Sequence, residues 1–334
     1  MNKKDDHIKG ALDQPVKTND FDGVRFIHDA LGETAVHQVS LDATMAGQPF
    51  PIPIYINAMT GGGELSEPIN RRLAMLAKHF GMPMAVGSLS AALKDPGWAQ
   101  SFTVIRDVNP EGFILANVGG EVSVELAQKA VDLLRADMLQ IHLNPLQELI
   151  MPEGDDDFSG ILKTIQTIHA SSDVPVMVKE VGFGMSREAL KKLEAIGIGI
   201  VDVSGKGGTN FATIENKRRD HALDYLEDFG LSTVESLIEA SSFASMEIHA
   251  SGGVRNPFDA IKAIRLGASM VGMSRYFLDL VRTHDHAEAV KRFEMFIEGM
   301  RRIMVLLGAK DFGALKTRPI VFSPELDHYH KQRS

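Results

Sequence analysis

Short runs rich in Val, Ile and Met recur along this chain, and each ends in small polar residues before a helical pattern begins. Apolar strands that alternate with helices are typical of a parallel sheet covered by helices. Amphipathic segments such as Glu67–Lys78, Val122–Arg135, Arg187–Ala195 and Pro257–Leu266 separate the runs. We count eight runs, at Ile52–Ala58, Met84–Ser88, Phe113–Val118, Met138–Leu143, Val176–Val181, Ile198–Ser204, Met246–Ser251 and Met270–Ser274.

Eight strand–helix units predict an α/β fold, the closed (β/α)8 TIM barrel, with an open doubly wound sheet as the alternative. We expect a single domain over residues 1–334, with an N-terminal arm over 1–50, the barrel over 51–310 and a C-terminal tail over 311–334. The interval between the sixth and seventh runs is the longest. Within it, residues 206–230 contain Gly-Gly-Thr and a charged run, so we expect an extended active-site loop after strand six.

The composition excludes several classes of protein. There are 35 Lys and Arg against 44 Asp and Glu, a formal net charge of −9, whereas a nucleic-acid partner needs a basic face. The absence of Cys excludes disulfides, a thiolate nucleophile and Cys-held metal clusters. No stretch approaches the ~20 apolar residues of a membrane span, and the N-terminus lacks the apolar segment of a secretory signal. We therefore expect a cytoplasmic protein without membrane contact.

Paired glycines and an arginine at the ends of strands seven and eight predict a phosphate site. Strand seven runs into Ser251–Arg255 and strand eight into Val271–Arg275. Glycines let backbone N–H groups approach an anion, and a following helix adds its positive dipole end. In barrels these two loops usually hold phosphate, and Arg275 is placed to add a charged contact. Such a site suits FMN.

Other strand ends suit the ring of a flavin. The segment Asn57–Gly62 after the first strand is small and backbone-rich, and Ser88 and Asn117 are placed to hydrogen-bond the polar edge of the ring. Lys179 ends strand five, where a cation stabilises an anionic reduced flavin. Thr209 offers a hydroxyl from the sixth loop. A simple ion pair between the lysine and its neighbouring glutamate, and a plain glycine hinge in the sixth loop, are the alternatives.

A cluster of polar residues follows strand four. Side chains alternate along a strand, so His142 and Asn144 point to the same side at its C-terminal end. Pro145 ends the strand, and Gln147 and Glu148 open the next segment. One carboxylate together with substrate phosphates and waters is a common way to hold Mg²⁺. We expect a substrate over the flavin to meet this cluster, the alternative being a hydrogen-bond network at the barrel rim.

These residues resemble the FMN-dependent type 2 isopentenyl-diphosphate isomerase family over nearly the whole chain. The His-Leu-Asn-x-x-Gln-Glu run is the specific motif, whereas the glycine loops occur in many FMN barrels. Three residues depart from the family pattern. Lys3 replaces the usual Arg, so a bidentate contact is lost while the charge is kept. Phe211 replaces the Trp of some members, and Ser274 replaces the usual Ala. The matching motifs are Lys3–His7, Phe21–Phe26, Ala58–Gly62, His142–Glu148, Met151–Asp155, Ser204–Thr209 and Ser251–Arg255.

The resemblance implies roles for residues along the whole chain. It implies that Lys3, Lys4, His7 and Gln147 bind the substrate diphosphate or its carbons. It further implies that His142, Asn144 and Gln147 are the catalytic group, and that Glu148 holds Mg²⁺. The residues that it implies for FMN are Ala58, Met59, Thr60, Ser88, Asn117, Lys179, Ser204, Thr209, Gly253, Arg255, Ser274 and Arg275.

The implied reaction moves a double bond in isopentenyl diphosphate to give dimethylallyl diphosphate, for isoprenoid biosynthesis. A proton is added at one terminal carbon and another is removed from C2, without net redox change. The flavin must be reduced, usually by NADPH, and through N5 it is the implied acid and base. The resemblance also implies a homo-oligomer, a tetramer or octamer.

Two other functions remain open. An FMN-dependent 2-hydroxy acid dehydrogenase or oxidase shares the barrel and the phosphate loops. It needs a His base and Arg groups for the substrate carboxylate after strand seven, where this chain has His249 followed by Ala-Ser-Gly-Gly and no such Arg groups. A non-catalytic flavin-binding barrel is the third interpretation, and the polar cluster after strand four is evidence against it.

Overall fold

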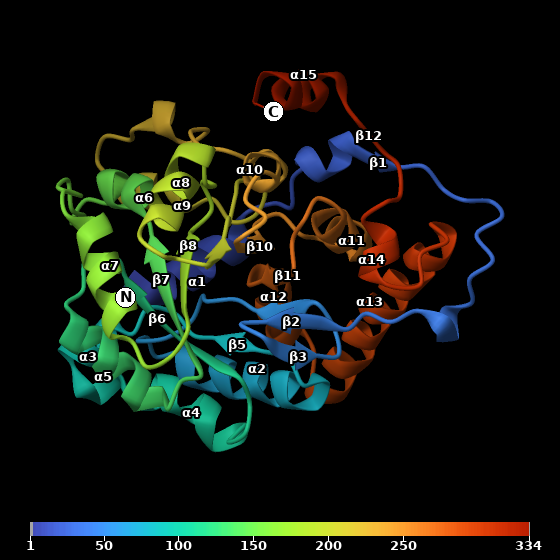
Figure 1. Cartoon of the computed structure of the whole chain (residues 1–334). Helices are drawn as coiled ribbons and strands as arrows, with labels where there is room; N and C mark the ends of the chain where they lie inside the picture. The colour runs from blue at the N-terminus through green and yellow to red at the C-terminus, as the bar shows by residue number, and fades with distance from the viewer. Residues whose placement is uncertain (1–2, 334) are drawn as a thin grey trace.

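The computed structural model describes residues 3–333 and contains a closed barrel of eight parallel strands (Figure 1). Each predicted run overlaps one strand, so the (β/α)8 prediction is confirmed. The open sheet is excluded, because the last strand pairs with the first through Val271 and Ile54. The strands are β4 (Ile54–Ile56), β5 (Met84–Ala85), β6 (Ile114–Gly119), β7 (Met138–Leu143), β8 (Val176–Glu180), β9 (Ile200–Asp202), β10 (Glu247–Ser251) and β11 (Met270–Met273).

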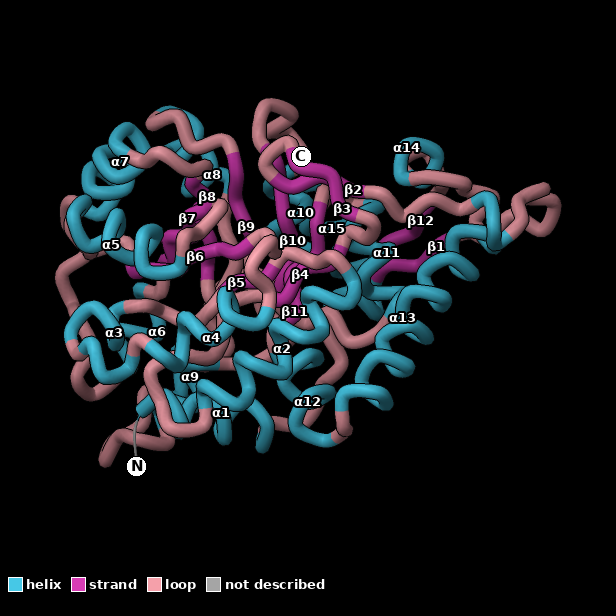
Figure 2. Tube along the Cα trace, turned by 90° about the horizontal axis from the view of Figure 1, so that it is seen from below, coloured by secondary structure: helices cyan, strands magenta, loops and turns pink. Residues whose placement is uncertain are grey.

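Helices surround the barrel strands (Figure 2). The predicted helices match α2, α5, α8 and α11 to within two residues at either end. Their starts are set by side-chain caps: Ser123 accepts the N–H of Leu126 in α5, and Asn256 caps α11 in the same way. The helices on the barrel are α2 (Ser66–Phe80), α3 (Ser90–Lys94), α4 (Gln100–Val108), α5 (Val124–Leu134), α7 (Ile161–Ser171), α8 (Arg187–Ala195), α10 (Thr233–Ala240), α11 (Pro257–Arg265), α12 (Arg275–Thr283) and α13 (His286–Leu306).

Several strands are shorter than the runs that predicted them. The run Ile52–Ala58, for example, contains only the three residues of β4, and Ile198–Ser204 contains the three of β9. In these two runs the last residues leave the hydrogen-bonded ladder at the C-terminal end of the barrel. These residues form the rim on which barrel enzymes build their sites.

The N-terminal arm divides into three parts. Helix α1 (Lys3–Asp13) lies at the C-terminal mouth of the barrel. Strand β1 (Val24–Phe26) pairs antiparallel with β12 (Ile320–Phe322) of the tail, and β2 (Ala43–Met45) and β3 (Gln48–Phe50) form a hairpin. The tail also contains the short helices α14 (Phe312–Leu315) and α15 (Pro324–Arg333).

The hairpin β2–β3 closes the N-terminal end of the barrel. Met45 is fully buried there, and the N–H of Ala46 donates to the carboxylate of Glu247 on β10. The arm is therefore part of the core and not only a substrate-binding segment. The buried residues that pack with Met45 are Tyr55, Ala85, Leu115, Met138, Met177 and Met270.

The extended loop after the sixth barrel strand is confirmed. It contains α9 (Phe211–Asn216) and a 3-10 helix at Asp224–Leu226 before α10 begins. Helix α9 packs against α1 and against α6 (Pro145–Ile150), the short helix after β7. The loop thereby brings the arm and the polar cluster together at the mouth of the barrel.

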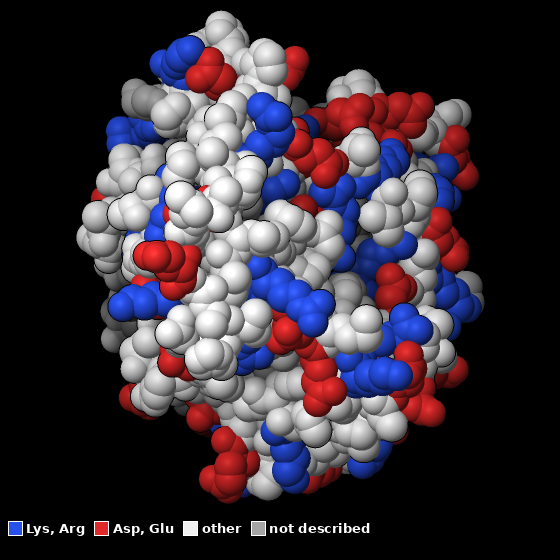
Figure 3. All heavy atoms as spheres, turned by 90° about the vertical axis from the view of Figure 1, so that its right-hand side faces the viewer, with Lys and Arg blue, Asp and Glu red and all other residues white. Residues whose placement is uncertain are grey.

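Positive and negative side chains are mixed on the surface. On the face in Figure 3, Lys and Arg are interspersed with Asp and Glu. Within residues 3–333, no helix is both long and apolar enough to cross a membrane.

We expect Met45→Ala to lower the free energy of unfolding by about 2–5 kcal/mol, because it opens a cavity under the closed end of the barrel. Denaturant unfolding of the variant measures this. Leu31→Ala, in the same arm but 85% exposed, is the control and is expected to change stability by less than about 0.5 kcal/mol. A Met45→Ala midpoint equal to that of the control would show that the hairpin adds nothing to the core.

Candidate active site

A cavity of about 930 Å³ opens at the C-terminal end of the barrel, within the ~300–1,000 Å³ typical of small-molecule sites. Its wall combines strand ends, helices α1, α6 and α9, and the glycine loops after β9 and β10. Nearly all of the predicted site residues lie on it: Lys4, His7, Ala58, Met59, Ser88, Asn117, His142, Asn144, Gln147, Glu148, Lys179, Ser204, Thr209, Gly253, Arg255, Ser274 and Arg275.

Two predicted residues are placed differently. Thr60 is buried beside the cavity but not on its wall, and its hydroxyl donates to the side chain of Asn70. Lys3 begins α1, and its side chain lies outside the described part of the structure.

The end of the cavity formed by β10 and β11 has hydrogen-bond donors without acceptors. The hydroxyl of Thr209 is buried, and no residue in the range 3–333 hydrogen-bonds it. The same holds for Nε of Arg275, whose nearest carboxylate, Asp279, lies 3.6 Å away. Helix α12 begins here without a side-chain cap, so its positive end is open to the cavity. These groups are of the kind that an anion such as the FMN phosphate would satisfy, so the residues present fit FMN.

Glycine is required where the two loops meet. Gly253 has φ +75°, which disfavours a side chain. A Cβ atom on Gly208 would lie 2.8 Å from the backbone nitrogen of Gly253. The loops after β9 and β10 therefore touch through their backbones and present a surface of peptide groups to a phosphate.

Lys179 lies in the middle of the site with only 5% of its surface exposed. Its Nζ donates to the backbone oxygen of Glu180 at 2.6 Å, so the predicted alternative of a carboxylate ion pair is not what holds it. The Glu180 carboxylate instead accepts the N–H groups of the next three residues. Burial lowers the pKa of Lys179, while the charges of Asp202 and Glu180 act against this.

Asp202 is a buried acid that sequence reasoning missed. Its carboxylate accepts hydrogen bonds from Tyr55 at 2.7 Å, from Asn57 at 2.8 Å and from Ser251 at 2.8 Å. Asn57 and Ser251 are on the cavity wall, so Asp202 lies directly beneath it. The one feature of the sequence that could have indicated its role is that Asp202 is a charged residue within the otherwise apolar run of strand six.

The surroundings of His142 favour its neutral form. Its Nδ1 lies 3.0 Å from the amide oxygen of Asn117, which can only accept, so Nδ1 carries the hydrogen. Burial, followed by the nearby charges of Lys179 and Lys4, lowers the pKa of His142 to about 3. The side chain is therefore a hydrogen-bonding group at neutral pH and not a proton donor of the imidazolium type.

Glu215 on α9 joins the arm to the polar cluster and was also missed. Its Oε1 lies 2.8 Å from Nε2 of His7 and accepts a 3.0 Å hydrogen bond from Gln147, while Oε2 pairs with Arg218. Burial raises the pKa of Glu215, but the hydrogen bonds from His7 and Gln147 outweigh it and hold the pKa near 2. Glu215 is the first residue of the charged run of the extended loop, and sequence reasoning noted that run without giving Glu215 a role.

Carboxylates gather at the far end of the cavity. Glu148 accepts a 2.7 Å hydrogen bond from Asn144 and one from the N–H of Asp155. Burial, and then the charges of Glu148 and Asp155, raise the pKa of Glu121. Across residues 3–333, no group of three or more His, Cys, Asp or Glu is arranged to hold a metal ion by itself. Glu148 fits the case in which one carboxylate shares Mg²⁺ with substrate oxygens.

The solved structures that this chain resembles are flavoproteins. A mutant flavocytochrome b2 with benzoylformate aligns with TM-score 0.70 at 20% identity, covering 100% of this chain and 81% of that one. A mandelate oxidase mutant with a bromo-substituted 2-hydroxy-methylphenylacetate aligns with TM-score 0.68 at 20% identity, covering 91% and 89%. At this identity the likeness concerns the fold.

Sequence comparison is more specific. Residues 143–321 match the FMN-dependent dehydrogenase family model. The isopentenyl-diphosphate delta-isomerases of Latilactobacillus sakei subsp. sakei (strain 23K) and Staphylococcus aureus (strain JH9) are each 48% identical, over 99% of this chain and 96% of theirs. With this identity over its whole length, the chain belongs to the isopentenyl-diphosphate delta-isomerase family, within the wider family of FMN-dependent dehydrogenases.

Proposed function

We propose that this chain converts isopentenyl diphosphate to dimethylallyl diphosphate with bound, reduced FMN. The observation that carries the proposal is the single cavity in which unpartnered phosphate-binding donors lie at one end and the His142, Gln147 and Glu215 cluster at the other. When bound, the reduced flavin supplies a proton donor and acceptor at its ring, which suits a site whose histidine is neutral.

The chain's own residues bind and orient the substrate in this proposal. Lys4 attracts the diphosphate to the mouth of the barrel, and the family resemblance gives Lys3 the same role. Glu148 shares Mg²⁺ with the diphosphate oxygens. His142 and Gln147, both neutral side chains, lie beside the hydrocarbon end of the substrate. Lys179 stabilises negative charge on the reduced flavin ring.

Glu215 has a positioning role in this proposal. Its ionised carboxylate fixes the side-chain amide of Gln147 and the ring of His7 in one geometry. Closure of α1 and α9 over the cavity also keeps water from the reacting carbons.

The structure gives less support to a 2-hydroxy acid dehydrogenase. That reaction needs a histidine base beside the flavin, but His249 is fully buried inside the barrel, away from the cavity wall, and is bonded to Glu247 at 2.6 Å. A purely flavin-binding barrel would have no use for a buried carboxylate that ties His7 of the arm to Gln147 of the polar cluster. Family resemblance supports NADPH as the reductant, a tetramer or octamer as the assembly, and the cytoplasm as the location.

The direct test is product formation. We expect pure protein, incubated without oxygen with isopentenyl diphosphate, FMN, NADPH and Mg²⁺ in D2O, to produce the paired vinylic methyl signals of the dimethylallyl product by proton NMR. Omission of FMN is expected to abolish them. Absence of product from protein that retains yellow FMN would contradict the isomerase proposal, and 2-hydroxy acids would then be the substrates to test.

Removal of the divalent ion is expected to lower activity. EDTA, or Glu148→Gln, should reduce kcat/KM by roughly 10–100-fold, the effect of losing one strong charged contact of ~1.5–3 kcal/mol. Excess Mg²⁺ should restore the EDTA-treated enzyme but not the variant. Full activity in EDTA would contradict the role of Mg²⁺ in the proposed reaction.

The neutral state of His142 gives a pH prediction. Because its folded pKa is about 3, we expect the imidazole to stay neutral from about pH 8 to pH 5, where histidines usually titrate. The unfolded chain gains a proton there, so this residue removes stability as pH falls below about 6.5. NMR of ¹⁵N-histidine-labelled protein, with His142→Gln to assign the signal, measures the titration. A midpoint near 6.5 would show that the surroundings of His142 do not lower its pKa.

A further inference from the structure

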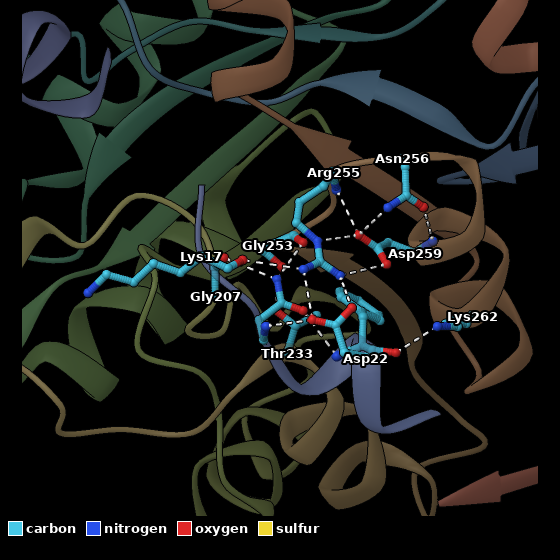
Figure 4. Close-up of polar contacts among 12 residues, drawn as sticks. Lys17, Asp22, Gly207, Thr233, Gly253, Arg255, Asn256, Asp259 and Lys262 are labelled. Carbon is cyan, nitrogen blue, oxygen red and sulfur yellow. Dashed lines mark hydrogen bonds and ion pairs between the residues drawn. The ribbon is translucent and has the colours of Figure 1, made fainter. Parts of the chain in front are cut away.

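The segment that joins α1 to the 3-10 helix at Asp20–Gly23 crosses the two glycine loops of the phosphate site. We call residues 12–22 the strap. Figure 4 shows Lys17 and Asp22 of the strap beside Gly207, Gly253 and Arg255. Since α1 carries Lys4 and His7 into the cavity, the strap connects the substrate end of the site to its phosphate end.

Asn19 fastens the strap to both loops with one side chain. Its Nδ2 donates to the backbone oxygen of Gly207 at 3.2 Å and to that of Gly253 at 2.9 Å. Its Oδ1 accepts the N–H of Phe21 at 3.0 Å, so donor and acceptor sides are both engaged. A Cβ atom on Gly253 would come within 2.8 Å of the Asn19 amide nitrogen.

Every N–H group of Arg255 donates a hydrogen bond to an acceptor in the protein. Nε donates to Asp259 at 2.8 Å and Nη2 to Asp22 at 2.6 Å and Asp259 at 3.2 Å. Nη1 donates to Asp22 at 2.9 Å and to the backbone oxygen of Lys17 at 3.3 Å. The backbone N–H donates to Asp259 at 3.0 Å. Because a guanidinium has five N–H bonds, no donor remains for a phosphate.

Arg275 differs from Arg255 in this respect. Its Nη2 also holds the strap, through the backbone oxygens of Leu12 at 3.2 Å and Gln14 at 2.5 Å, but its Nε is buried without a hydrogen-bond partner. Gln14 in turn exchanges two hydrogen bonds of 2.8 Å with the backbone of Asn210. The strap is therefore attached at both ends and in the middle.

We propose that Arg255 and Asn19 are positioning residues that fasten the strap over the phosphate loops, so that the strap retains FMN and fixes α1 over the cavity. This inference rests on the FMN part of the proposed function. It assigns Arg255 to the strap and leaves Arg275, Thr209 and the backbone of the loops to contact the phosphate. FMN then leaves only when the strap opens.

Asp22→Asn tests the proposal, because the two possible roles of Arg255 give opposite results. Asp22 pairs with Arg255 but does not line the cavity. If the pair fastens the strap, FMN dissociation should become about threefold to tenfold faster, as expected for a partly exposed bidentate pair. If Arg255 binds phosphate, loss of its competitor Asp22 should slow dissociation or leave it unchanged. Recovery of flavin fluorescence on dilution measures the rate.

Asp20→Asn is the matched control, because it removes the same charge from the same turn but lies outside the Arg255 contacts. It is expected to release FMN at the wild-type rate. Asn19→Ala is the second variant, and it should also speed release without removing a charge. Thermal unfolding of all three variants checks that the barrel remains folded.

Hydrogen exchange in the flavin-free protein gives a readout without the cofactor. We expect exchange in residues 3–22 to rise at least threefold in Asp22→Asn and Asn19→Ala, and not in Asp20→Asn. Unchanged exchange in both variants, or FMN release no faster than wild type, would overturn the proposal. Neither readout uses isopentenyl diphosphate, so a protein that responds as predicted but forms no product would contradict the isomerase function alone.

Discussion

The buried carboxylate of Glu215 holds the two halves of the active site together. It has no exposed side-chain surface and bonds His7 of the arm, Gln147 of the polar cluster and Arg218 of its own loop. A buried charge is stable only while its partners stay in place, and removal of one partner commonly costs about 3–5 kcal/mol. The positions of α1, α6 and α9 therefore depend on one another through this group.

The charges of the cavity are arranged around this contact. Lys179 and Arg275 place positive charge where the flavin ring and its phosphate would lie, and Lys4 does so at the mouth. His142, between them, stays neutral because burial and the nearby lysines oppose its protonation. The site thus places cations where anionic groups would bind and a neutral histidine between them, so in the proposed reaction the reduced flavin and not His142 would supply the proton.

Local patterns predicted the parts of the structure that local forces determine. The eight runs and α8 were found because apolar periodicity and capping act within a few residues. The His142–Glu148 cluster was found because it is contiguous. Glu215 and Asp202 were missed because their partners are distant in the sequence: His7 and Glu215 are 208 residues apart. The Met45 hairpin was missed for the same reason, since its burial depends on the closed barrel.

Arg255 shows a further limit of sequence reasoning. A motif gave its place on the loop after β10 correctly, but the direction of its side chain depends on Asp22, 233 residues away. Thr60 is similar, because Asn70 takes its hydroxyl away from the cavity wall. The sequence thus predicts which residues lie at a strand end. Which hydrogen-bond partner each side chain takes depends on residues that only the folded structure brings near.

The measurement that tests the account most directly is the ratio of product formed to NADPH consumed, without oxygen. If the flavin is reduced once and then turns over many substrate molecules, dimethylallyl diphosphate should greatly exceed the NADPH consumed. A one-to-one ratio would mean that the flavin loses its electrons in every turnover and has to be reduced again, and it would contradict the isomerase mechanism for which this cavity is proposed.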